Sequence, residues 1–159
     1  MQKAAELLHS WAENAMRQSM WAFFKFNQTR SLSSSQVNSL FYINRSGKAT
    51  VNDLAKRWGV SKAAASQIVE KMVDQGWLER TENPLDRRSR DLSLTAEGKA
   101  LVKEAHIERH SWIDEFIKGL DDTDLEKVIP ALEILNSKMM IFNEEFEKAL
   151  TGRSHSCVD

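Results

Sequence analysis

One stretch of the chain places small and hydrogen-bonding side chains at helical spacing on a single predicted face. Its members are Lys62, Ala63, Ser66, Gln67, Glu70 and Lys71, with Ser61 directly before them. The amide of Gln67 can pair with one adenine through two hydrogen bonds, and the hydroxyl of Ser66 can bond to several bases. Small residues leave a helix room to enter a major groove. Taken alone, the pattern is equally typical of a solvated helix face in another kind of helical domain.

The second candidate is a basic run, Asp86-Arg87-Arg88-Ser89-Arg90, which follows the turn signal Asn83-Pro84. Guanidinium groups suit phosphate contact and insertion into a narrow minor groove. We expect Asp86 to hold an arginine or loop amides in place. A charge run on a turn is more often simply solvated. Beside the helix pair described next, nucleic-acid contact becomes the better interpretation.

The elements that must position these residues begin with two short helices. Thr50 and Asp53 form a capping box for a helix that ends at Trp58, and Gly59 permits a tight turn. Ser61 then caps a second helix over 61–75. We expect its inward face to be Ala65, Ile68, Val69 and Met72.

A β-hairpin is predicted after the second helix, which closes at Gly76. Trp77–Thr81 and Asp91–Leu94 alternate in polarity and therefore read as two strands around the basic run. This order, helix, turn, helix and hairpin, predicts a winged helix-turn-helix that binds double-stranded DNA. We expect Trp58 and Trp77 to belong to its core.

Long amphipathic helices flank this module. We expect one over 3–27, one from the Ser33–Gln36 capping box to Gly47, one from Thr95 to about Leu120, and a last one kinked at Pro130. The apolar residues of the terminal helices exceed what one small module can cover, so we expect a homodimer. The fold class is thus mainly α (α+β). Its expected parts are a dimerisation region (1–32 and 95–150), a winged helix (33–94) and a flexible tail (151–159).

The composition is that of a globular protein without a membrane span. Residues 1–49 carry a net charge of +4, residues 50–94 carry +1 and residues 95–159 carry −6, so the acidic third should face away from phosphates. We find neither a signal peptide nor an apolar run of membrane length. The single cysteine, Cys157, fits the reducing cytoplasm. Nucleophile motifs, phosphate-binding glycine loops and paired carboxylates are lacking, which argues against an enzyme.

At this point the chain resembles the MarR family of bacterial transcriptional regulators. The resemblance rests on Asp86-x-Arg88-x-x-x-Leu92-x-Leu94-Thr95-x-x-Gly98 and on the stretch from Ser61 through Gly76 to Arg80, which is similar to the family's recognition helix and the strand after it. It implies an obligate dimer that binds a near-palindromic operator, usually as a repressor, and that a small, often aromatic ligand releases. It also implies that Arg88 enters the minor groove, oriented by Asp86. Gln67 departs from the arginine that relatives often carry there, which affects the base preference.

Other residues leave alternatives open. His106 and His110, spaced i, i+4, could share a metal in a metal-responsive regulator, although a structural pair is favoured. Trp11, Met16, Tyr42 and Arg45 are candidates for an effector pocket. Oxidation sensing through Cys157 is disfavoured. A winged-helix module that binds proteins is the remaining alternative. We expect no cofactor.

Overall fold

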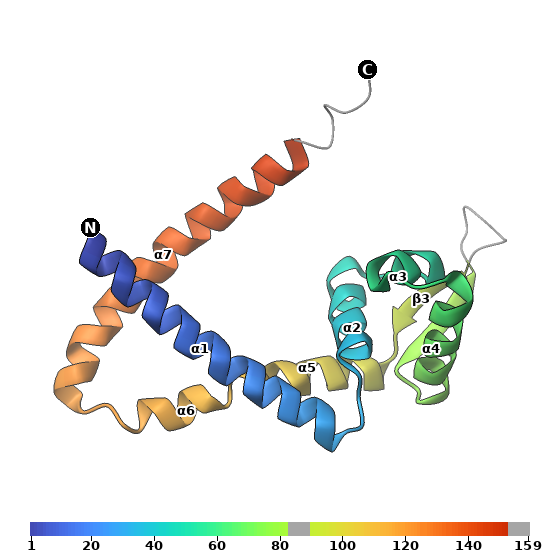
Figure 1. The fold of residues 1–159 in the computed structure, drawn as a ribbon, viewed down its shortest axis with the longest axis horizontal. Coiled ribbons are helices and arrows are strands. Elements are labelled where there is room, and N and C mark those ends of the chain that lie inside the picture. The colour runs from blue at the N-terminus through green and yellow to red at the C-terminus, as the bar shows by residue number, and fades with distance from the viewer. Residues whose placement is uncertain (83–89, 153–159) are drawn as a thin grey trace. The chain divides into compact units, whose positions relative to one another are not determined.

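The computed structural model of the chain describes residues 1–82 and 90–152, with side chains up to Phe146 in the last helix. It divides into two compact units, Met1–Asp114 and Glu115–Asp159. Figure 1 shows the order of the elements. The fold is mainly helical with one small sheet, as the sequence predicts. Within the described residues, every helix is too short or too polar to cross a membrane.

Seven helices and three strands make up the described residues. In chain order they are α1 (Gln2–Thr29), α2 (Ser34–Ser46), β1 (Ala49–Thr50), α3 (Val51–Trp58), α4 (Lys62–Asp74), β2 (Leu78–Glu82), β3 (Arg90–Leu94), α5 (Ala96–His110), α6 (Trp112–Ile117) and α7 (Asp122–Gly152).

The predicted caps begin these helices. Ser33 and Thr50 each accept from the backbone N–H three residues on, and the side chains of Gln36 and Asp53 accept from the backbone N–H of the capping residue in return. Such reciprocal bonds satisfy amides that a helix start leaves without partners. Gly59 has φ 66° and ψ 33°, the left-handed conformation that ends α3 and turns the chain into α4.

A three-stranded antiparallel sheet with the order β1-β3-β2 completes the winged helix. β2 and β3 pair from Leu78 opposite Leu94 to Glu82 opposite Arg90. β1 is only two residues long and was not predicted. Its partner is β3, and the nearby Lys48 Nζ lies 2.8 Å from the buried carboxylate of Asp91.

The core of the first unit joins the winged helix to α1 and α5. Fully buried side chains from α2, α3, α4 and the sheet meet residues of α5 and the end of α1 in one cluster, which includes Phe26, Leu40, Leu54, Met72, Leu92 and Val102. Trp58 and Trp77, which the sequence predicts in the core, are half-buried and pack against it. α1 packs along α5, and Trp112 Nε1 donates to Ser19 Oγ at 3.0 Å.

The prediction of one continuous helix from Thr95 to about Leu120 is wrong in one respect. α5 ends at His110, Ser111 interrupts it, and α6 is a separate short helix. The Ser111 hydroxyl donates to the Glu108 carbonyl at 2.9 Å. A serine hydroxyl that bonds to a nearby backbone carbonyl competes with the backbone hydrogen bonds of the helix. The apolar spacing continues through Ser111, so the sequence pattern does not indicate the break.

The second unit is dominated by α7. Asp121 Oδ1 accepts from the N–H of Asp124 at 2.8 Å, so the acidic start of this helix is capped as well as favoured by the helix dipole. The helix passes through Pro130. Large apolar residues along it are exposed within this chain, among them Leu132, Leu135, Met139, Phe142 and Phe146.

Candidate nucleic-acid interface

Helix α4 presents the face that the sequence predicts. Ser61 Oγ accepts from the N–H of Ala64 at 3.2 Å and begins the helix. Ala65, Val69 and Met72 are fully buried, and Ile68 is half-buried against the core. Because that stripe holds α4 on α3 and the sheet, the opposite face must point outward.

The outward face of α4 carries the candidate base-reading side chains. Lys62, Ala63, Gln67 and Lys71 are exposed, as is Ser61 at the helix start, whereas Ser66 is half-buried. An exposed amide and two exposed ammonium groups on one helix can bond to base edges and phosphates. The residues singled out from the sequence therefore share one accessible surface.

An ion pair neutralises the acidic group on this face. Arg80 Nη2 on β2 lies 2.6 Å from Glu70 Oε2 on α4, and the two side chains are 30% and 55% exposed. A pair this exposed contributes little to stability. The pair matters instead for the charge of this face. Glu70 alone would repel phosphate. With Arg80 beside it, Lys62 and Lys71 make the face positively charged. Sequence reasoning did not assign this role to Arg80.

Helix α3 supports α4 from behind. The side-chain hydrogen bond from Thr50 Oγ1, at 2.7 Å, and the backbone bond from the Thr50 N–H hold the pKa of Asp53 below its usual value. The cap of α3 therefore stays charged and intact at neutral pH. At the other end, Trp58 Nε1 donates to the buried Ser39 Oγ of α2 at 2.8 Å, which fixes α3 to the core.

The strands of the predicted wing are present. Arg90 is exposed at the start of β3, opposite Glu82 of β2. Thr95 Oγ1, just after β3, donates to the Gly76 carbonyl at 2.5 Å and accepts from the Gly98 N–H at 3.0 Å. This links the hairpin base to the end of α4 and the start of α5. Asp86, Arg87 and Arg88 lie outside the described residues.

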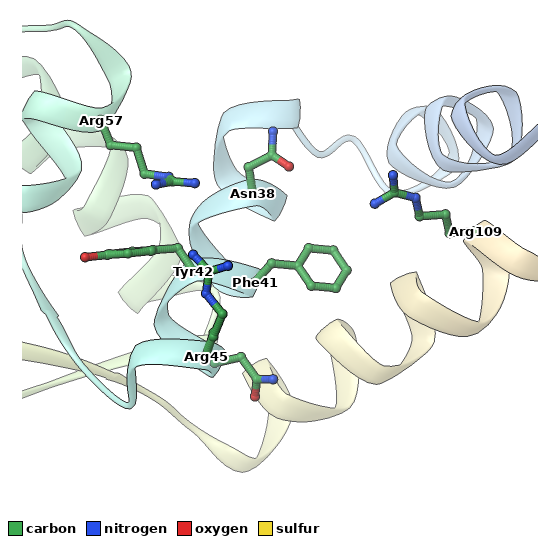
Figure 2. A pocket seen from close by; sticks show the side chains of 7 residues that line it. Asn38, Phe41, Tyr42, Arg45, Arg57 and Arg109 are labelled. Atoms are coloured by element: carbon green, nitrogen blue, oxygen red, sulfur yellow. The ribbon is translucent and has the colours of Figure 1, made fainter. Parts of the chain in front are cut away.

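The candidate effector residues separate into two places. Tyr42 and Arg45 line a pocket of about 380 Å³ together with Asn38, Phe41, Asn44, Arg57 and Arg109 (Figure 2). Trp11 and Met16 are exposed on α1 and do not line this pocket. The lining residues come from α2, α3 and α5, a juxtaposition that only the tertiary fold creates.

His106 and His110 lie close together at the end of α5. Their ring centroids are 4.7 Å apart, and His110 Nδ1 lies 2.8 Å from the His106 carbonyl oxygen. Both side chains are exposed. In the part of the chain that the structure describes, no group of three or more histidine, cysteine or acidic residues could hold a metal ion.

Comparison with known proteins shows that part of this chain matches a known family. Residues 31–89, which run from the end of α1 into the wing, match the model of the MarR family. Over these residues the chain is similar to the MarR family. It is 27% identical over 114 residues to the HTH-type transcriptional regulator TcaR of Staphylococcus aureus, covering 70% of this chain and 75% of that one. It is 24% identical over 106 residues to BilQ of Clostridioides difficile, covering 67% and 72%.

Solved MarR-family structures share the fold. The transcriptional regulator Tm0710 of Thermotoga maritima superposes with a TM-score of 0.72 at 21% identity, covering 91% of this chain and 99% of that one. A variant of MarR from E. coli, solved with operator DNA, superposes at 0.52 with 22% identity, covering 82% and 91%. The family and the named relatives are transcriptional regulators, so the expectation that this chain is not an enzyme is confirmed.

Proposed function

We propose that this chain is a MarR-family regulator and binds a palindromic operator as a homodimer, with helix α4 of each subunit in a major groove. The observation that supports this most directly is the outward face of α4, where Lys62, Gln67 and Lys71 are exposed and Glu70 is neutralised by Arg80. Two such helices on one face of the DNA would be spaced by about one turn, ~34 Å. The protein would act on the chromosome in the cytoplasm.

The dimer is supported by apolar surface that each unit leaves exposed. On α1, Trp11, Met16, Met20, Trp21 and Phe24 are all more than half exposed. On α7, Met139, Phe142 and Phe146 are also more than half exposed. Apolar area of this extent is rarely left in water by a monomer. A two-fold contact between copies would cover it and would present two reading helices.

Repression and its relief by a small molecule complete the proposal. An operator-bound dimer would block transcription, and an effector would release the DNA by binding better to a subunit geometry that does not fit both half-sites. The pocket beside Tyr42 and Arg45 supports a role for an effector, because it lies against α3, the helix that packs on α4.

The experiment is a titration of duplex DNA carrying the palindrome found upstream of the genes next to this one. We expect tight binding by a dimer in sedimentation, with an affinity that falls steeply as salt rises, because neutralised phosphates release counterions. A winged-helix module that binds only proteins would show no such salt slope. A zinc-dependent regulator would need metal for the same binding.

We predict that Gln67→Ala relaxes sequence discrimination at one or two base pairs, by about 1–3 kcal/mol each. Ser66→Ala should have the same kind of effect. Removing an amide or hydroxyl that reads a base lowers the difference in binding free energy between operators with the correct and with an incorrect base. Binding to a library of operator variants measures it. Gln75→Ala, at the far end of α4, is the matched control and should keep the parent profile. An unchanged profile for Gln67→Ala would show that α4 does not read bases.

We predict that Arg88→Ala weakens binding to every duplex and lowers the salt slope by about one phosphate contact. A guanidinium at the wing tip would contact backbone and minor groove, not a particular base. Arg87→Ala should matter less. Arg90→Ala is the structural comparison, since Arg90 lies in β3 opposite Glu82, and its effect should also be smaller. Unchanged affinity and slope for Arg88→Ala would contradict a role of the wing in DNA contact.

A further inference from the structure

The pocket beside Tyr42 and Arg45 adjoins a second hollow along the same helices. This second hollow, of about 310 Å³, is lined by Phe41, Asn44, Lys99, Val102, Lys103 and His106. Phe41 and Asn44 line both hollows, so the two adjoin along α2 and α5. We call them together the α2–α5 groove. Each is at the small end of the range for ligand pockets, and together they are large enough for a molecule of two rings or more.

The charge of the α2–α5 groove is one-sided. Among the described residues that line it, Arg45, Arg57, Arg109, Lys99 and Lys103 are cationic, and none is a carboxylate. The ion pairs between described residues use other side chains, such as Arg30 with Glu104. Five cations gathered without described counter-charges repel one another, in a chain whose net charge is −1. An anion in the groove would relieve that repulsion.

Aromatic rings fix two of these guanidinium groups. Arg57 lies over the ring of Tyr42 at 4.7 Å, and Arg109 lies over the ring of Phe23 at 5.7 Å. Figure 2 shows Arg57 and Arg109 on opposite sides of the pocket, with Tyr42 beneath Arg57 and with Arg45 and Phe41 between the two sides. Stacking of this kind leaves the N–H edges of an arginine available for bidentate hydrogen bonds to an oxyanion. The half-buried ring of Phe41, between the two hollows, can pack against a planar ligand.

We propose that the α2–α5 groove binds an aromatic ligand with at least two negative charges, as in a phosphorylated aromatic compound. One carboxylate occupies one guanidinium fork, which would leave most of the positive charge unused. A phosphate ester brings close to two charges and three acceptor oxygens at neutral pH. The proposal specifies the effector class of the function proposed above and rests on it for its regulatory meaning.

The route from the groove to the DNA-reading helix runs through Arg57. It lies in the last turn of α3, and α3 packs directly on α4. A phosphate that binds the N–H edge of Arg57 pulls on the last turn of α3 and biases the position of this helix. The ligand would therefore lower operator affinity, and by linkage operator DNA would lower ligand affinity by the same factor.

Calorimetry on the full chain at pH 8 and fixed ionic strength tests the ligand class. The probes are 1-naphthyl phosphate, 1-naphthoate, 1-naphthol and inorganic phosphate, which separate ring from charge. We expect 1-naphthyl phosphate to bind about tenfold or more tightly than each of the others. Equal affinity for 1-naphthoate would overturn the requirement for two charges. No binding of 1-naphthyl phosphate would overturn the site.

Variants locate the binding and separate it from DNA contact. Arg45→Gln with Arg109→Gln should weaken 1-naphthyl phosphate binding about tenfold or more, whereas Arg17→Gln on α1, outside the groove, should leave it unchanged. Loss of operator binding by the double variant without any probe would mean that the groove contacts DNA, and would overturn the proposal. A parent protein that binds the probe but no duplex would leave the ligand site standing and remove the proposed function.

Discussion

Replacing Gly98 by alanine should destabilise the first unit by about 3 kcal/mol, because the added methyl group overpacks a buried site. A Cβ atom there would lie 2.1 Å from the carbonyl oxygen of Trp77 and 3.3 Å from Leu94 Cδ2. The nearest atom belongs to the backbone, so it cannot swing aside as the end of a flexible side chain would. That same carbonyl accepts from the Thr95 N–H at 3.1 Å, and moving it would disturb the junction of α4, the wing and α5.

Denaturant unfolding followed by circular dichroism measures this loss. Glu108→Ala, an exposed position on the same helix, is the control and should change stability by no more than about 0.5 kcal/mol. Equal stability of Gly98→Ala and the parent would show that α5 can move away from Trp77 at little cost. In that case the close approach of Gly98 to Trp77 would not constrain the position of α5.

The local elements of this fold could be predicted because short-range chemistry specifies them. Ser33, Thr50, Ser61 and Thr95 each accept from a backbone amide three residues on, and that spacing is visible in the sequence. The turn at Gly59 is equally local. The buried stripe of α4 follows from helical periodicity, and its outward face is what remains.

Features that depend on distant contacts were not visible in the sequence. The two-residue strand β1 exists only because β3 lies beside it. The break at Ser111 interrupts an apolar spacing that continues on both sides. The fold places Arg57 over the ring of Tyr42 and brings Arg109 into the same pocket, although each arginine alone reads as an ordinary surface residue. Trp11 and Met16 were grouped with that pocket because of their residue type, which carries no information on position.

Replacing Phe142 by aspartate should abolish the dimer and with it tight operator binding. The Phe142 side chain is 59% exposed within this chain, and its ring stacks on that of Phe146 at a centroid distance of 6.2 Å. In the proposed dimer both rings are covered by the other subunit. An unpaired carboxylate there would lose its hydration without a compensating partner, which costs more than the contact can supply. Phe146→Asp should act in the same way.

The same helix offers a matched control. Ser137→Asp adds the same charge to α7 at helical spacing from Glu126, Glu133 and Glu144, a face that already carries acids, so it should leave assembly intact. Sedimentation should show a dimer for the parent and for Ser137→Asp, and a monomer for Phe142→Asp. A monomer has one α4 helix and can bind only one half-site at a time. The affinity of Phe142→Asp for the full palindrome should therefore fall about 100-fold or more. A monomeric parent, or a monomeric variant that binds the full palindrome with parental affinity, would contradict the assembly on which the proposed function depends.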